Sequence, residues 1–80
     1  MDVKKAIVLR INSVCSERKI ALNELSNLCG LTPSTVYSLM DSTRKDVRIT
    51  TIKKICDGLE ITLGEFFTSA EFDNLEQEIK

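Results

Sequence analysis

Residues 21–40, ALNELSNLCGLTPSTVYSLM, decide the fold of this chain. Leucines recur at helical spacing in the first half, and this helix is expected to end at Gly30, because a left-handed residue closes a helix most easily. Thr32 is a good N-cap for a following helix. Pro33 then occupies the first helical position, where its missing N–H costs nothing. The stretch therefore predicts two short helices joined by a tight turn.

Short helices are also predicted on both sides of this stretch. Before it, apolar residues recur at spacings of three and four, as they do on one face of a helix. They are Val3, Ile7, Ile11, Val14 and Cys15. After it, Thr50 or Thr51 is suited to cap a fourth helix, and Thr62 to cap a short fifth helix over residues 63–67.

The last residues, 68–80, are predicted to form an acidic C-terminal helix. Phe72, Leu75 and Ile79 would lie along one stripe of it. No segment shows the sustained alternation of polar and apolar residues that is typical of a strand. At 80 residues the chain is long enough for one small domain. The sequence therefore predicts a single all-α domain over residues 1–80, a compact bundle of five or six short helices.

The two helices and the turn of residues 21–40 are the parts of a helix-turn-helix. Apolar side chains are spaced to hold its second helix against the core; they are Leu25, Leu31, Val36 and Leu39. The polar face of that helix would then project outward. The major groove of B-DNA is wide enough to admit such a helix.

A fuller pattern accompanies this motif. It consists of Glu24-Leu25, the turn Cys29-Gly30-Leu31-Thr32, Ser34-Thr35-Val36, and ITTIKKICDGLEITLGEFF over residues 49–67. On these segments the sequence resembles the Cro/phage-repressor-type (Cro/C1-type, XRE-like) helix-turn-helix family of bacterial and phage regulators, over residues 6–67. The resemblance implies a lambda-repressor-like DNA-binding domain.

The resemblance also implies roles for particular residues. Ser34, Thr35 and Ser38 lie at the positions where the family contacts bases. Thr32 and the backbone amides after it lie where the family binds phosphate. For Tyr37, contact with the sugar-phosphate backbone and packing against a neighbouring helix remain alternatives.

The chain departs from the family pattern at several positions. Leu22 stands where the family often has Gln, and Pro33 occupies a recognition position that often carries a long polar side chain. A buried Arg–Glu pair of the family corresponds here to Cys15 and Met40, so both partners are apolar. Asp41 would either be repelled by phosphate or accept a hydrogen bond from a cytosine amine.

The distribution of charge supports a nucleic-acid contact, although the formal net charge is only −1. Residues 44–54 carry five basic side chains against one acidic side chain, a net charge of +4, whereas residues 71–80 carry −3. Arg44, Lys45 and Arg48 follow the predicted recognition helix directly. We therefore expect these three side chains to hold DNA phosphates.

Composition excludes several other functions. The chain has no histidine, no Cys-x-x-Cys and no glycine-rich phosphate loop, so we expect no enzyme, no metal site and no cofactor. The three cysteines are expected to be reduced core residues of a cytoplasmic protein. No signal peptide and no apolar stretch long enough to cross a membrane is visible in the sequence.

The leading hypothesis is a sequence-specific regulator of transcription, expected to be a repressor, that binds double-stranded DNA through its third helix. We expect a homodimer at least on DNA and no small-molecule effector. Leu9 and the terminal apolar stripe are alternatives for the dimer surface, against an ordinary exposed leucine and a stripe that covers the core. The alternative is a protein-interaction module, such as an antitoxin-like subunit of a toxin–antitoxin pair. The departures at Leu22, Pro33 and Asp41 keep this alternative open.

Overall fold

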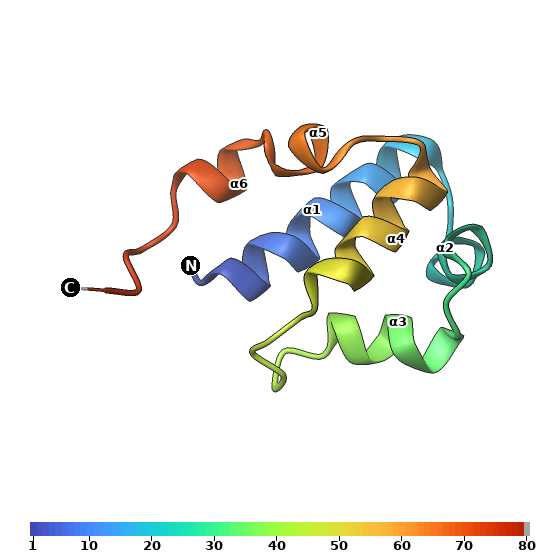
Figure 1. Ribbon diagram of the computed structural model, residues 1–80, viewed down its shortest axis with the longest axis horizontal. Helices are drawn as coiled ribbons and strands as arrows, with labels where there is room; N and C mark the ends of the chain where they lie inside the picture. Colours follow the sequence, from blue (N-terminus) through green and yellow to red (C-terminus); the bar gives the residue numbers. More distant parts are fainter. Residues whose placement is uncertain (80) are drawn as a thin grey trace.

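Six helices make up the computed structural model, which describes residues 1–79 (Figure 1). They are α1 (Val3–Arg18), α2 (Leu22–Cys29), α3 (Pro33–Met40), α4 (Ile49–Leu59), α5 (Leu63–Phe67) and α6 (Ala70–Asp73). In Figure 1, α3 lies along one side of the molecule and α5 along the opposite side, with α1 and α4 between them. The prediction of an all-α bundle is confirmed for the described residues. None of these helices is long and apolar enough to span a membrane.

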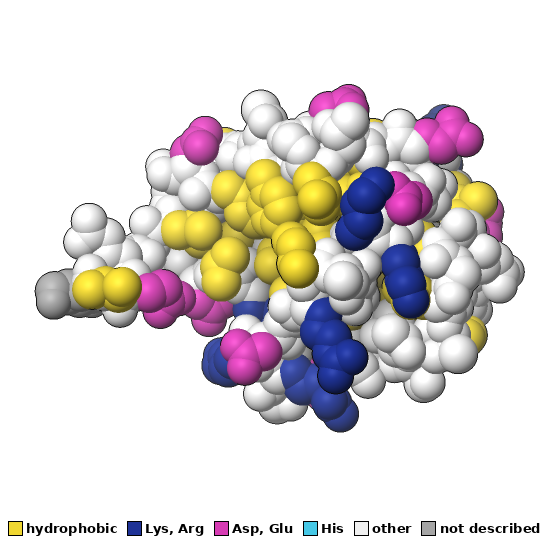
Figure 2. Space-filling model, viewed as in Figure 1, with side chains coloured by type: hydrophobic (Ala, Val, Ile, Leu, Met, Phe, Trp, Pro, Cys, Tyr) yellow, Lys and Arg dark blue, Asp and Glu magenta, His cyan; other side chains and the backbone are white. Residues whose placement is uncertain are grey.

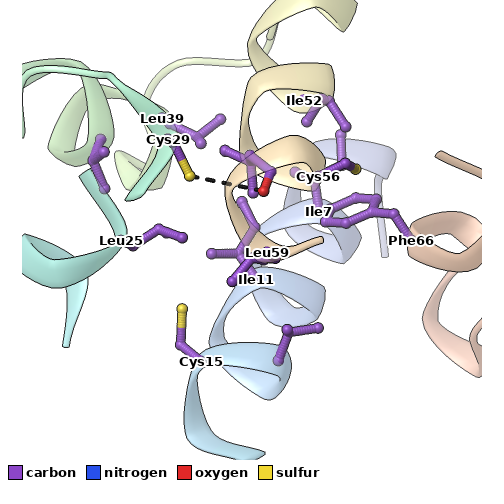
Figure 3. Packing of buried hydrophobic residues seen from close by; sticks show 13 residues of the cluster. Ile7, Ile11, Cys15, Leu25, Cys29, Leu39, Ile52, Cys56, Leu59 and Phe66 are labelled. Carbon is purple, nitrogen blue, oxygen red and sulfur yellow. Dashed lines mark hydrogen bonds between the residues drawn. The ribbon is translucent and has the colours of Figure 1, made fainter. Parts of the chain in front are cut away.

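One hydrophobic cluster joins the first five helices (Figure 3). Its largest fully buried side chains are Phe66, Ile11, Leu25, Ile52, Ile55, Leu59 and Val36. Burying a side chain of this size stabilises the fold by about 1.5–3 kcal/mol. The ring of Phe66 meets the edge of Phe67 at a centroid distance of 5.1 Å, and Phe67 meets Phe72 at 4.9 Å. These aromatic contacts attach α6 to the rest of the bundle.

The end of α2 and the starts of α3 and α5 form as the sequence predicts. Thr32 caps α3, its Oγ1 accepting from the backbone N–H of Thr35 at 3.2 Å, and Pro33 is the first residue of that helix. Gly30 closes α2 with a left-handed φ of 67°. Thr62 and Glu65 form a reciprocal capping box at the start of α5. Contacts between residues close in the sequence therefore set the end of α2 and the starts of α3 and α5.

A close crossing of α2 and α4 positions the helix-turn-helix on the core. A Cβ atom added to Gly58 of α4 would lie 2.6 Å from Cys29 Sγ and 2.8 Å from the carbonyl oxygen of Leu28. Cys29 Sγ in turn approaches the carbonyl oxygen of Ile55 at 3.7 Å (Figure 3). We call this contact, formed by Leu28, Cys29, Ile55 and Gly58, the α2–α4 crossing. It exists because Gly58 has no side chain.

The three cysteines are free thiols buried in the core, as predicted. Burial raises the pKa of the Cys29 thiol to about 11. Burial also raises the pKa of Cys15 and of Cys56. A thiol reacts through its thiolate, so these three side chains act as small apolar groups at neutral pH.

Three cationic side chains of α1 hydrogen-bond the carboxyl ends of three other helices. Lys4 Nζ donates to Asp41 O, at the end of α3, and to Arg44 O. Arg10 donates to two carbonyls in the last turn of α5, at 2.8 and 2.9 Å. Arg18 Nη1 donates to Leu59 O at the last residue of α4. Apart from Arg44 O, which lies outside the helices, the acceptors are carbonyl groups that lack a partner within their own helix, at the negative end of the helix dipole.

The structure differs from the sequence prediction at both ends of the chain. Val3, expected on the buried face of α1, is 41% exposed, while the neighbouring Lys4 is buried. The predicted C-terminal helix over residues 68–80 is reduced to α6, which ends at Asp73, and residues 74–79 are not helical. The last residue of that predicted helix, Lys80, lies outside the described residues. Ile79 is 90% exposed and buries no apolar surface that would hold a longer helix in place.

The start of α4 also differs from the prediction. The helix begins at Ile49, and its N-cap is Arg48, which makes no side-chain capping bond. Neither Thr50 nor Thr51 is the cap. The backbone hydrogen bonds of the first turn, from the N–H groups of Thr51 and Ile52 to Arg48 O, show that the helix is already formed at these residues.

Candidate nucleic-acid interface

Helix α3 presents its polar face to solvent. Val36 and Leu39 on its inner side are buried in the core. The predicted base-contacting residues Ser34 and Thr35 are exposed, and Ser38 is half-buried. The packing of α3 on α2 and the core thus leaves the predicted recognition face free.

Hydroxyl groups gather at the amino end of α3. Thr32 Oγ1 lies 3.2 Å from Ser34 Oγ and 2.8 Å from Thr35 Oγ1. Each hydroxyl can donate or accept, so the group can exchange these contacts for contacts with a ligand without leaving a buried atom unpaired. The amino end of a helix also favours anions, because its first N–H groups point outward.

Tyr37 lies beside α2. Its hydroxyl donates to Asn23 Oδ1 at 3.4 Å, and the side chain is 54% exposed. The structure therefore shows the tyrosine attached to a neighbouring helix. Its remaining exposed surface borders the polar face of α3.

Residues 41–48, which connect α3 to α4, form what we call the 41–48 loop. The Asp41 carboxylate accepts from the backbone N–H and the hydroxyl of Thr43, at 2.9 and 2.8 Å. These hydrogen bonds lower the pKa of Asp41. Arg44 Nε lies 3.8 Å from the same carboxylate, so Asp41 is engaged in holding the first turn of the loop.

Four of the predicted site residues meet around one groove between α3 and the start of α4. The groove has a volume of about 230 Å³, and Thr35, Ser38, Arg44 and Arg48 line it. Thr51 and the acidic Asp46 line it as well. The groove therefore joins the polar face of α3 to two guanidinium groups.

The other predicted residues lie outside this groove. Thr32 and Ser34 are at the amino end of α3, and Tyr37 is beside α2. Lys45 lies near the start of α1, where its Nζ is 3.7 Å from the carboxylate of Asp2.

Opposite charges occupy different parts of the surface. In Figure 2, several Lys and Arg side chains run toward the lower edge of the molecule, the side on which Figure 1 shows the 41–48 loop. Most of the Asp and Glu side chains in this view lie along the upper edge and on the C-terminal tail. The surface beside α3 is thus the more basic one.

Two residues of this region are not predicted from the sequence. Lys4 reaches the 41–48 loop from inside the molecule, and no signal in the sequence marks it, because most lysines are exposed. Thr51 was considered only as a possible helix cap. It lines the groove because α4 begins earlier than predicted.

Comparisons with known proteins agree with this geometry. Residues 10–69 match the profile of the Cro/C1-type HTH DNA-binding domain. The "Uncharacterized HTH-type transcriptional regulator YozG" of Bacillus subtilis (strain 168) is 32% identical over 60 residues, which are 75% of this chain and 71% of that protein. Among solved structures, "prophage Lp1 protein 11" is similar with a TM-score of 0.82 and 25% identity, over 94% of this chain and 100% of that one. This chain therefore belongs to the family of Cro/C1-type helix-turn-helix DNA-binding domains.

Proposed function

We propose that this protein is a sequence-specific regulator of transcription that binds double-stranded DNA and represses by occupying its site. The observation that carries the proposal is the free polar face of α3 beside the two arginines of the groove. A helix of this kind enters the major groove with its first residues toward the base edges. The arginines beside α3 then contact the phosphates that border the major groove.

In this arrangement Ser34, Thr35 and Ser38 contact bases. The phosphate contacts are assigned to Thr32, Tyr37, Arg44, Lys45 and Arg48. Hydroxyl side chains make single rather than bidentate hydrogen bonds with bases, so one domain discriminates modestly between sequences. Most of the affinity would come from the phosphates.

A homodimer on DNA compensates for this modest discrimination. Two copies on half-sites about 34–36 Å apart, one turn of the duplex, would double the number of base contacts. The operator is then expected to be a pseudo-palindrome with that spacing.

The direct test is selection from a random duplex pool at low salt, followed by a salt titration on the selected duplex. We expect enrichment of a two-fold-related motif, and an affinity that falls by about 0.9 log unit per log unit of salt for each phosphate contact. If no duplex is enriched, the proposed function is wrong.

Base contacts by α3 are tested by Ser34→Ala and Ser38→Ala. Each change removes one hydrogen bond to a base, so the order of preference among variant duplexes should change by about 1 kcal/mol at one base position. Ser16→Ala is the matched control, because Ser16 is exposed on α1. Losses that are equal on all duplexes would show that α3 does not contact bases.

A further inference from the structure

Lys4 is a buried cation with an unusual set of partners. Its side chain is 4% exposed, and Nζ lies 2.9 Å from Asp41 O and 2.7 Å from Arg44 O. A buried ammonium group is costly unless it is hydrogen-bonded. The two carbonyl oxygens supply these bonds, from residues 37 and 40 positions away in the chain.

Both acceptors belong to the first turn of the 41–48 loop. Asp41 is the C-cap of α3, and its carbonyl also accepts from the backbone N–H of Arg44 at 3.2 Å. The Asp41 carboxylate holds the same turn through Thr43. The turn is therefore held by its own acidic side chain and, from the interior, by Lys4.

The hydrogen bonds from Lys4 constrain the loop more strongly than the exposed ion pairs of the loop do. The ion pairs of Arg44 with Asp41 and of Lys45 with Asp2 are 3.8 and 3.7 Å long and exposed. Exposed pairs of this length contribute little. The two bonds from Lys4 are short and charge-assisted, and they connect the loop to α1, an element of the core.

We propose that Lys4 is a positioning residue for DNA binding, which fixes the end of α3 and the backbone of Arg44 so that the arginines of the groove face the phosphates while α3 contacts bases. The inference rests on the proposed function. Lys4 itself touches no DNA in this arrangement, because it is buried beneath the loop. Lys4 orders the loop in the free protein. The free-energy cost of ordering the loop is then not part of DNA binding.

The test is a double-mutant cycle on the selected duplex with Lys4→Met and Arg44→Ala. Methionine keeps an unbranched side chain and loses all donors, so we expect affinity to fall about tenfold on every duplex, since the loop must then be ordered during binding. The double variant should lose less than the product of the two single losses, because Lys4 acts through Arg44. Lys4→Arg, which keeps the donors, should recover most of the affinity.

Two control variants separate positioning from charge and from stability. Lys5→Met removes the same charge from an exposed neighbour, and its affinity should stay close to that of the wild type. Arg18→Met removes the bond to the end of α4 and should lower the unfolding temperature without changing the affinity of the folded protein. If Lys4→Met behaves like Arg18→Met, the role of Lys4 is only structural and the proposal is wrong.

Hydrogen exchange of the backbone amides of residues 42–48 in the free protein supplies a measurement without DNA. These amides should exchange faster in Lys4→Met than in Lys5→Met. If wild-type protein binds duplex DNA but Lys4→Met changes neither exchange nor affinity, the positioning role fails and the proposed function stands. If the wild type enriches no duplex, the proposed function fails and the positioning role fails with it. Lys4→Leu, which also lacks donors, serves if the methionine variant does not fold, and failure of both to fold would show a purely structural lysine.

Discussion

The α2–α4 crossing and the 41–48 loop hold the two ends of the helix-turn-helix in contrasting ways. The crossing fixes α2 on the core by direct contact, with Gly58 pressed on Cys29 so closely that a methyl group does not fit. The loop holds the far end of α3 through hydrogen bonds and two exposed ion pairs, with Val47 packed against the core, and most of its side chains are exposed.

This difference predicts that stability and the proposed DNA contact depend on different parts of a chain of 80 residues. A packed crossing tolerates almost no change in volume, because interiors are as dense as crystals. An exposed loop tolerates substitution with little effect on folding. Substitutions in the crossing should therefore change the free energy of unfolding, and substitutions in the loop should change binding.

The largest effect is expected from Gly58→Ala. The added methyl group would overlap Cys29 Sγ and the carbonyl oxygen of Leu28, which belongs to the backbone and cannot rotate away. We expect a loss of about 2–3 kcal/mol in the free energy of unfolding, the upper part of the range for overpacked cores. Urea denaturation measures it.

Gly64→Ala is the matched control for this substitution. A Cβ atom at Gly64 meets only Thr62 Oγ1, at 3.7 Å, which is an ordinary contact. Its unfolding midpoint should be equal to that of the wild type or slightly higher. Equal midpoints for the two alanine variants would contradict a close α2–α4 crossing.

An intermediate effect is expected from Arg44→Ala, which should weaken DNA binding without changing stability. One lost phosphate contact reduces the salt slope by about 0.9, which corresponds to roughly eightfold weaker binding near 0.1 M salt. The loss should be the same on every duplex, and the unfolding midpoint should not change, because Arg44 is exposed. A change in sequence preference would instead place Arg44 on a base.

The smallest effect is expected from Asp41, whose carboxylate makes the free energy of unfolding depend on pH. The pKa of Asp41 is lowered by its hydrogen bonds with Thr43, so this contribution to stability is present above the unfolded pKa of about 3.8 and is lost as pH falls through the folded value. Unfolding midpoints measured between about pH 5 and pH 2.5 should fall less steeply in Asp41→Asn than in the wild type. Parallel curves would show that the carboxylate does not hold the turn.

The sequence predicts the parts of the structure that depend on neighbouring residues. Gly30, Thr32 and Pro33 act within one turn of helix, so the boundary between α2 and α3 and the outward face of α3 follow directly from them. Four of the residues that line the groove, Thr35, Ser38, Arg44 and Arg48, were predicted as site residues, because they lie on that face or follow it closely in the sequence.

The parts that the sequence did not predict depend on residues far apart in the chain. The burial of Lys4 requires carbonyl groups from a loop 37 residues away, and the need for glycine at position 58 requires Cys29 on another helix. The C-terminal helix ends early for a related reason. Ile79 follows the helical spacing, but nothing in the described part of the chain covers it.

The hydrogen bonds from three side chains of α1 to the ends of other helices have a consequence for cooperativity. Lys4, Arg10 and Arg18 all belong to α1. The carboxyl ends of α3, α5 and α4 therefore receive hydrogen bonds from side chains of one helix. When α1 detaches, all three ends lose the hydrogen bonds from these side chains in the same event. The other five helices are each too short to be stable alone, so the bundle is expected to unfold in one transition.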